Sequence, residues 1–217
     1  LMKAEDRPEE KRKPMVFYGT SITQGGCASR PGMVHTAILG RKFDRPVVNL
    51  GFSGNGTLDP EFATLLGEID ASVYVLDCLP NLQPKQVAER TEPFVKALRK
   101  IRPNTPIVLV EDRNYTNSPF HPGLAKRNTE NQAALKTAYE NLKNEGVTGL
   151  FYIPGATLLG DDHEATVDGS HPTDLGFLRQ AEAFATVLAR VWSDLCVDPS
   201  ACVRSCLRLA KSINRSS

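Results

Sequence analysis

Five short apolar segments recur along the chain, and a segment with helical patterning follows each of them. The apolar segments are continuous and rich in β-branched or aromatic residues, which is typical of parallel strands buried on both faces. They are 15-MVFY, 46-PVVNL, 72-SVYVLD, 106-PIVLVE and 148-TGLFYI. This alternation predicts an α/β fold, in which a doubly wound parallel sheet of five strands lies between two helical layers.

Three of the helices can be placed from their sequence. The apolar residues of the segment 84–101 fall on one helical face, namely Val87, Phe94, Val95, Leu98 and Ile101. Pro93 lies inside this segment, and we expect it to kink or split the helix. A second helix is expected over about 122–145, with Gly146 as its C-cap. A last helix should begin near Thr173.

Length and composition fit a single soluble domain. The chain has 217 residues, of which 41% are hydrophobic and 24% charged. Its net charge of +1 argues against a nucleic-acid partner held by electrostatics. No apolar run approaches the ~20 residues that a membrane span needs. We expect a charged lead-in or linker over 1–14, the folded domain over 15–195 and a basic tail over 196–217.

The start of the sequence leaves the compartment open. The chain begins at Leu1 without a recognisable signal peptide, as a piece of a longer precursor would. The sequence is that of a soluble protein, secreted or periplasmic if a signal peptide has been removed. No pattern in it favours a particular oligomeric state.

The five cysteines do not form a disulfide framework. Cys27 and Cys78 lie in the predicted domain, and the tail holds Cys196, Cys202 and Cys206. A zinc site in the tail would need a fourth ligand, and no histidine follows His171. Free or loosely paired thiols are expected, with a single Cys196–Cys202 bridge as the alternative.

Polar and glycine-rich residues concentrate in the loops that follow the predicted strands. In open parallel sheets, ligands bind beyond the carboxyl ends of the strands. The loops at that edge are 19-GTSITQGG, 51-GFSGNGT, 77-DCLPNL, 111-EDRNYTN and 154-PGATLLGDDHEATVDGSHPTD. We therefore expect the functional site among these five loops.

Two of these loops hold the groups that acyl transfer by a serine requires. Such chemistry needs an exposed hydroxyl, an imidazole that takes its proton and a carboxylate that orients the imidazole. Ser21 offers the hydroxyl, and Asp168 and His171 lie three residues apart in 168-DGSHP. Ser21 alone would more often be a helix cap, and the other two a hydrogen-bonded loop pair. Their joint appearance on strand-end loops favours catalysis.

The order of the motifs resembles the SGNH (GDSL-type) hydrolase superfamily over residues 15–190. Ser21 in 19-GTSIT matches the nucleophile block, although threonine replaces the usual aspartate of GDS. Gly54 in 51-GFSGNG matches the glycine of the second block, and Asn81 in 77-DCLPN matches the asparagine of the third, with different neighbours. Asp168 and His171 match the DxxH block.

The resemblance implies a three-layer α/β/α sandwich of flavodoxin-like strand order, without a metal or organic cofactor. It implies that the Ser21 N–H, the Gly54 N–H and the Asn81 side chain form the oxyanion hole. The wording of 18-YGTSITQGGCASRPG and 168-DGSHPTDLGF is most similar to bacterial members that deacetylate carbohydrates. The expected function is thus a serine esterase acting on short acyl esters, on a small-molecule or carbohydrate substrate. A lysophospholipase or thioesterase for longer chains and a non-catalytic carbohydrate-binding relative are the alternatives.

Other candidate sites are weaker. Glu111, Asp112 and Arg113 end the fourth predicted strand, where they would contact substrate or form salt bridges at the rim. The cluster 161-DDHE would be either a metal site or a solvated loop. The stretch 51-GFSGNG lacks the spacing of a dinucleotide-binding loop.

Overall fold

The structure is a computed structural model that describes residues 6–193 of the chain. The predictions for the tail, including its three cysteines and the alternative Cys196–Cys202 bridge, lie outside the described residues. No helix within residues 6–193 combines the length and the apolar character that crossing a membrane requires.

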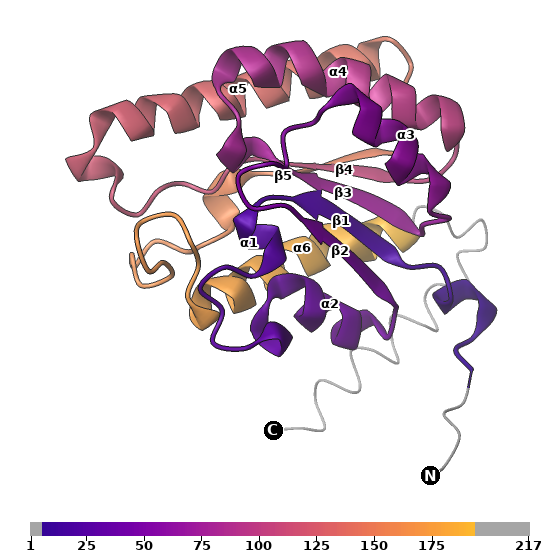
Figure 1. Cartoon of the computed structure of the whole chain (residues 1–217), viewed down its shortest axis with the longest axis horizontal. Helices are drawn as coiled ribbons and strands as arrows, with labels where there is room; N and C mark the ends of the chain where they lie inside the picture. The colour runs from indigo at the N-terminus through magenta and orange to yellow at the C-terminus, as the bar shows by residue number, and fades with distance from the viewer. Residues whose placement is uncertain (1–5, 194–217) are drawn as a thin grey trace.

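Five parallel strands form one sheet, as the alternation of apolar segments predicted (Figure 1). The strands are β1 (Met15–Gly19), β2 (Val47–Gly51), β3 (Val73–Asp77), β4 (Ile107–Val110) and β5 (Leu150–Ile153). Their order across the sheet is β2-β1-β3-β4-β5, and all four neighbouring pairs are parallel. The first strand therefore lies inside the sheet, and its carboxyl end is flanked by the ends of β2 and β3.

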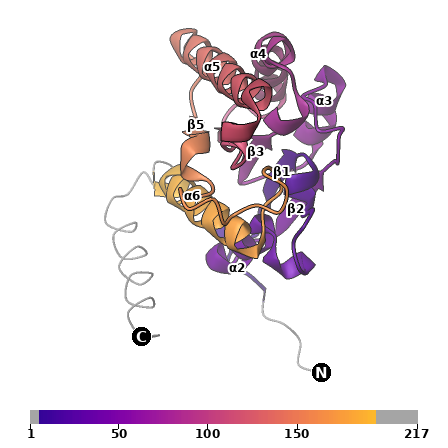
Figure 2. The ribbon, with the colours of Figure 1, turned by 90° about the vertical axis from the view of Figure 1, so that its left-hand side faces the viewer.

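Helices cover both faces of the sheet (Figure 2). The longer helices and the short helix that follows β1 are α1 (Ser21–Gln24), α2 (His35–Phe43), α3 (Pro60–Glu68), α4 (Pro84–Ile101), α5 (Pro122–Asn144) and α6 (Asp174–Ser193). The helices α3, α4 and α5 form one layer, whereas α2 and α6 form the other (Figures 1 and 2). The predicted three-layer α/β/α sandwich is thus confirmed.

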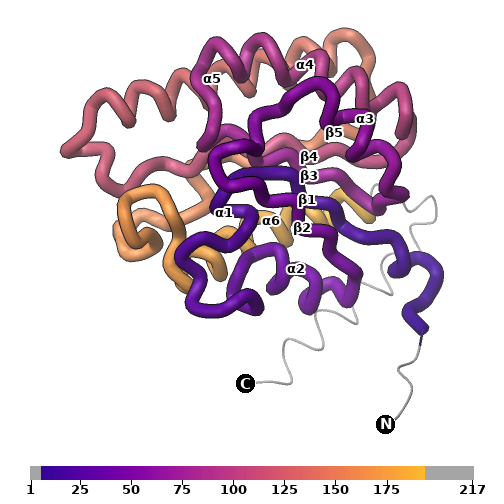
Figure 3. Tube along the Cα trace, in the orientation of Figure 1, coloured from indigo at the N-terminus to yellow at the C-terminus, as the bar shows by residue number. Residues whose placement is uncertain are grey.

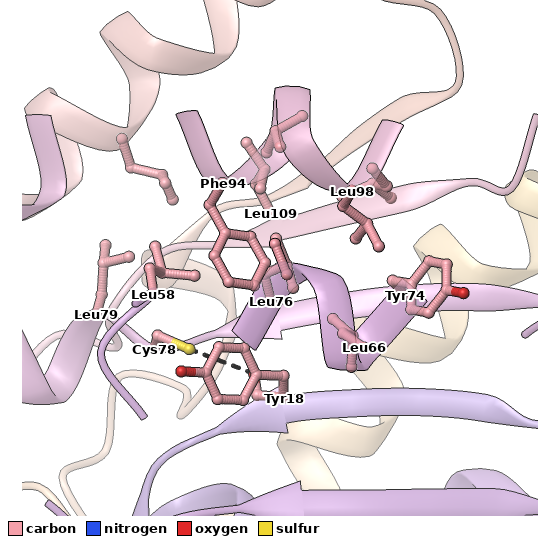
Figure 4. Packing of buried hydrophobic residues seen from close by; sticks show 14 of the residues in the cluster. Tyr18, Leu58, Leu66, Tyr74, Leu76, Cys78, Leu79, Phe94, Leu98 and Leu109 are labelled. Atoms are coloured by element: carbon pink, nitrogen blue, oxygen red, sulfur yellow. Dashed lines mark hydrogen bonds between the residues drawn. The ribbon is translucent and has the colours of Figure 1, made fainter. Parts of the chain in front are cut away.

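Each central strand supplies side chains to both cores, because successive residues of a strand point to opposite faces. In β1, Val16 and Tyr18 belong to the core beneath α3, α4 and α5, and Met15 and Phe17 belong to the other. Tyr18 faces Phe94 of α4 (Figure 4). The centroids of the two rings lie 5.7 Å apart. Burial of both faces explains why the strand segments are continuously apolar rather than alternating.

Two details of the helices refine the sequence predictions. Pro93 does not split α4, which runs without a break from Pro84 to Ile101. The side chain of Pro93 is exposed, so water can reach the backbone carbonyl that loses its partner to the proline. The helix α5 ends at Asn144, and Gly146 then adopts a left-handed φ of 84°, which glycine adopts without strain.

The described part of the charged lead-in contacts the domain surface. Arg7 and Lys11 form ion pairs with Asp44 at 3.2 and 3.6 Å, and Lys13 forms one with Asp70 at 3.0 Å. All of these side chains are exposed, so each pair contributes at most about 1 kcal/mol.

His35 of α2 is fully buried in the core beneath α2 and α6. Its ring packs against Phe17, Phe177 and Phe184, with centroids 6.0, 5.8 and 5.1 Å away. Neither ring nitrogen has a hydrogen-bond partner within residues 6–193. Burial, assisted by the positive charge of Arg113, lowers the pKa of His35 to about 3. His35 is therefore a neutral core residue at physiological pH.

We expect His35 to make the fold sensitive to acid. An unfolded histidine binds a proton below about pH 6.5, whereas folded His35 does so only near pH 3. Its contribution to stability is complete above pH 6.5 and is lost as the pH falls, by about 2 kcal/mol between pH 8 and pH 5. Between pH 8 and pH 5, the free energy of unfolding measured with urea should fall by about 2 kcal/mol less in His35→Leu than in the unchanged protein. Equal pH dependence in the two proteins would contradict this assignment.

Candidate active site

Ser21 lies at the carboxyl end of β1, where the strand turns into α1. Thr20 is buried and caps this helix, because its Oγ1 accepts a hydrogen bond from the backbone N–H of Ile22 at 3.2 Å. Threonine serves as an N-cap much as aspartate does, which accounts for GTS in place of GDS. Ser21 is thus the first helical residue rather than the cap, and its hydroxyl faces elsewhere.

The hydroxyl of Ser21 faces the loop that precedes α6. Its Oγ lies 2.8 Å from Nε2 of His171, a residue 150 positions later in the chain. Figure 3 shows that loop lying at the same edge of the molecule as α1. The two segments meet because the carboxyl ends of parallel strands lie at one edge of the sheet.

Asp168 holds the other ring nitrogen of His171. Nδ1 of His171 lies 2.7 Å from Oδ2 of Asp168, whose Oδ1 accepts from the backbone N–H groups of Ser170 and His171 at 2.9 and 2.7 Å. Partial burial pushes the pKa of Asp168 upward, but these hydrogen bonds outweigh it and the net shift is downward. An ionised carboxylate only accepts, so Nδ1 carries the proton and Nε2 can accept from Ser21.

Gly54 lies in the exposed loop between β2 and α3. Its φ of 72° is left-handed, and a Cβ placed there would contact nothing within 4 Å. The backbone N–H groups of Gly54 and Ser21 have no hydrogen-bond acceptor among the described residues. Both N–H groups are therefore available to a ligand.

Asn81 is the last residue of η3 (Leu79–Asn81), a 3-10 helix of one turn that follows β3. It lies beside the loop that carries Gly54. In the more favourable orientation of its amide, Oδ1 accepts from the backbone N–H groups of Gly56 and Asn55 at 3.2 and 3.3 Å. The amide nitrogen Nδ2 then lies on the side of the amide that faces away from these two N–H groups. The second and third predicted blocks are thus in direct contact.

The loop after β2 approaches the end of β1 so closely that only glycine fits at position 56. A Cβ on Gly56 would lie 2.0 Å from the carbonyl oxygen of Gly19. A Cβ on Gly26 would lie 3.5 Å from Cδ2 of His171, so the loop after α1 also borders the imidazole. This packing gathers the hydroxyl, the imidazole and the loop of Gly54 at one end of the sheet.

The structure does not fit the prediction that residues 111–113 bind substrate. Asp112 and Arg113 are fully buried, and Nη2 of Arg113 donates to Asp77 at 3.1 and 3.3 Å. Glu111 is half-buried and accepts from the Tyr152 hydroxyl at 2.6 Å. These side chains bind other groups of the protein, because β4 places them beneath the surface rather than at its rim.

The ion pair between Asp77 and Arg113, which lies under α1, was not predicted from the sequence. Besides Arg113, Asp77 accepts from the Thr23 hydroxyl of α1 at 3.3 Å. Burial raises the pKa of Asp77 to about 6 although the Arg113 charge opposes it. The only sequence signal was a pair of opposite charges at the ends of two strands.

The segment after β4 supports the loop that carries Asp168. This support was not predicted from the sequence either. Thr116 donates its backbone N–H to the carbonyl of Gly169 at 3.0 Å, and Nδ2 of Asn117 donates to the carbonyl of Asp168 at 3.3 Å. Polar residues that contact a distant loop through its backbone leave no spacing pattern in the sequence.

Other sequence candidates do not join this site. In the 161–164 cluster, Asp162 forms an ion pair with Arg179 at 2.6 Å, and no group of three or more potential ligands within residues 6–193 is placed to hold a metal ion. Two hollows of about 740 and 600 Å³ include Pro106, at the amino end of β4, in their linings. Neither hollow includes Ser21 or His171, which lie at the opposite end of the sheet.

Comparisons with known proteins show which sequences and structures the chain resembles. The model of the GDSL-like Lipase/Acylhydrolase family matches residues 12–189. No curated protein sequence matches the chain significantly. Among solved structures, a protein from Bacteroides ovatus described as a GDSL-like lipase is 37% identical with a TM-score of 0.81, covering 86% of this chain and 55% of its own.

Two further structures share the fold at lower identity. A two-domain esterase active on acetylated mannans is 17% identical with a TM-score of 0.64, covering 83% of this chain and 50% of its own. Est24, a carbohydrate acetylesterase from Sinorhizobium meliloti, is 14% identical with a TM-score of 0.62, covering 83% of this chain and 100% of its own. The chain thus spans about half the length of the Bacteroides and mannan-active proteins.

Replacing Arg113 by methionine should destabilise the protein without weakening substrate binding. Removing the guanidinium leaves Asp77 buried without its cation, which costs about 3–5 kcal/mol in the free energy of unfolding. The control Arg90→Met removes a partly exposed ion pair with Asp59 and should cost about 1 kcal/mol or less. Chemical denaturation and the KM of ester hydrolysis are the measurements. Unchanged stability with a raised KM would restore the substrate-binding prediction for Arg113.

Proposed function

The chain belongs to the GDSL-like lipase/acylhydrolase family, and from this premise we propose that it is a serine esterase with Ser21, His171 and Asp168 as its catalytic triad. The observation that carries the proposal is the continuous chain of contacts from Ser21 Oγ to His171 Nε2 at 2.8 Å and from His171 Nδ1 to Asp168 at 2.7 Å. Nucleophile, base and orienting carboxylate occupy their required order.

The proposed reaction proceeds through an acyl-enzyme. Ser21 Oγ attacks the ester carbonyl while His171 Nε2 takes the hydroxyl proton, and the carbonyl oxygen becomes an oxyanion. The tetrahedral intermediate collapses, the bond to the alcohol breaks, and His171 gives its proton to the leaving alcohol. Water then attacks the acyl-enzyme with His171 as base, and the acid leaves with Ser21 regenerated. Asp168 stabilises the imidazolium without taking its proton.

Three donors would stabilise the oxyanion: the N–H groups of Ser21 and Gly54 and the Nδ2 group of Asn81. The two N–H groups have no internal acceptor within the described residues. The Asn81 amide is oriented by backbone donors at Oδ1. Each donor of this kind contributes on the order of 10²–10³ to kcat.

For the substrate, we propose a short acyl ester, in particular an acetyl ester of a carbohydrate. The sequence resemblance to carbohydrate-deacetylating members supports this choice. The open position of the triad also supports it, since the side chains of His171 and Asp168 remain 32% and 52% exposed. A bulky, hydrated alcohol such as a glycan can approach a site of this kind.

Exposed apolar side chains favour a second candidate, an esterase for longer acyl chains. Phe120 is 82% exposed and Val167 is 62% exposed. Val167 adjoins Asp168 in sequence, and Phe120 follows the Asn117 that supports the Asp168 loop. Exposed apolar groups beside a polar site can receive an acyl chain.

The reactivity of Ser21 decides between an enzyme and a non-catalytic carbohydrate-binding relative. We expect a fluorophosphonate to form one adduct, on the peptide that contains Ser21, and Ser21→Ala to lose both labelling and at least about a thousandfold in kcat. Ser193→Ala, a change at the far end of α6, should label as the unchanged protein does. Mass spectrometry of the digested adduct is the measurement. An unreactive Ser21 in folded protein would leave binding as the function.

A chain-length series separates the two esterase candidates. With nitrophenyl esters we expect kcat/KM to fall from acetate to octanoate, and Phe120→Ala to change acetate hydrolysis by less than about twofold, because an acetyl group reaches no distant apolar surface. A preference for octanoate that is lost in Phe120→Ala would replace the acetyl proposal with the longer-chain one.

A further inference from the structure

Asn131 of α5 is a fully buried asparagine in the middle of a long helix. Its Nδ2 donates to the backbone carbonyls of Leu82 at 3.0 Å and of Leu79 at 3.3 Å. Asparagine is a poor helix former, and burying its amide is unfavourable unless hydrogen bonds compensate. Helix stability therefore does not explain why an asparagine occupies this position.

The two carbonyls that Asn131 binds bracket the turn that presents Asn81. In the part of the chain that the structure describes, two backbone hydrogen bonds close the turn, from Leu82 N–H to the Leu79 carbonyl at 2.9 Å and from Asn81 N–H to the Cys78 carbonyl at 3.1 Å. Nη2 of Arg127 also donates to the Pro80 carbonyl, at 3.5 Å. Within the described residues, Asn131 is the sole hydrogen-bond donor to the Leu82 carbonyl. The side chain of Asn131 thus ties both ends of η3 to α5.

The position of this turn also determines the contact between Asn81 and the loop of Gly54. Asn81 meets that loop through Gly56 and Asn55, at 3.2 and 3.3 Å. These distances leave little room for displacement, because a hydrogen bond of this length weakens steeply when it lengthens. A shift of η3 would move the Asn81 amide and loosen the loop beside it.

We propose that Asn131 is a positioning residue for the oxyanion hole, acting through Asn81. The inference rests on the proposed function, in which Asn81 stabilises the oxyanion. Asn131 is buried behind the turn and binds only its backbone, so it affects catalysis by fixing where the Asn81 amide points. Oxyanion stabilisation depends on donors that are already in place when charge develops.

The same helix provides a matched control. Asn128 lies one turn earlier, is also buried, and donates from Nδ2 to the carbonyl of Arg113 at 3.0 Å. It therefore supports the segment after β4 and not η3. Replacing either asparagine by leucine removes one buried amide of the same type from the same helix face.

The test is a double-mutant cycle measured with nitrophenyl acetate. We expect Asn131→Leu to lower kcat by about ten- to a hundredfold with little change in KM, because a small misplacement of a catalytic group has effects of this size. In the Asn81→Ala background, Asn131→Leu should lower kcat by less than about twofold further, since the group it positions is already absent. Asn128→Leu should change kcat by the same factor in both backgrounds.

Equal effects of Asn131→Leu with and without Asn81 would overturn the proposal, as would an unchanged kcat in folded Asn131→Leu. If Asn131→Leu does not fold, Asn131→Ser takes its place in the cycle with the same expectations. The ¹⁵N–¹H signals of the Asn81 side chain provide a readout that needs no turnover. They should shift in Asn131→Leu and not in Asn128→Leu, and unshifted signals would overturn the positioning role even if Ser21 proved inactive and the proposed function failed.

Discussion

The contact between the hydroxyl of Ser21 and the imidazole of His171 is the interaction on which the other features of the site depend. It joins residues 150 positions apart, at a distance of 2.8 Å that tolerates little error. The parallel sheet makes this possible, because it delivers the carboxyl ends of β1 and its neighbours to one edge. Groups from four separate loops, those after β1, β2, β3 and β5, can then meet although these loops are far apart in the sequence.

Beneath this edge, the protein buries polar groups that a purely apolar core would exclude. Asp77 and Arg113 lie under α1, and the amides of Asn128 and Asn131 hold the loops after β4 and β3. Burying a polar group reduces stability, and within the described residues Oδ1 of Asn131 and both Nε and Nη1 of Arg113 have no hydrogen-bond partner. The hydrogen bonds that these side chains do form allow few alternative arrangements. We infer that the fold accepts this cost to hold short, irregular loops in one conformation.

Part of this arrangement could be predicted from the sequence. The five strands follow from continuous apolar segments, and Ser21, Asp168 and His171 stand out because their chemistry is recognisable and they follow strands. The roles of Asp112 and Arg113 could not be predicted, since a charge after a strand points outward or inward depending on how the helices above pack. Asn131 was missed for a related reason: its partners are backbone carbonyls, which every sequence possesses.

The close approach of Gly56 to the carbonyl of Gly19 means that the two sides of the site differ in how far they tolerate substitution. Even a methyl group at position 56 would collide with the backbone at the end of β1, so this side cannot be reshaped by ordinary substitution. The opposite flank, with its exposed Phe120 and Val167, has no such restriction. Substitutions that adapt the site to new esters, in nature or in a laboratory library, would therefore accumulate around His171. The residues beside Ser21 would stay nearly invariant.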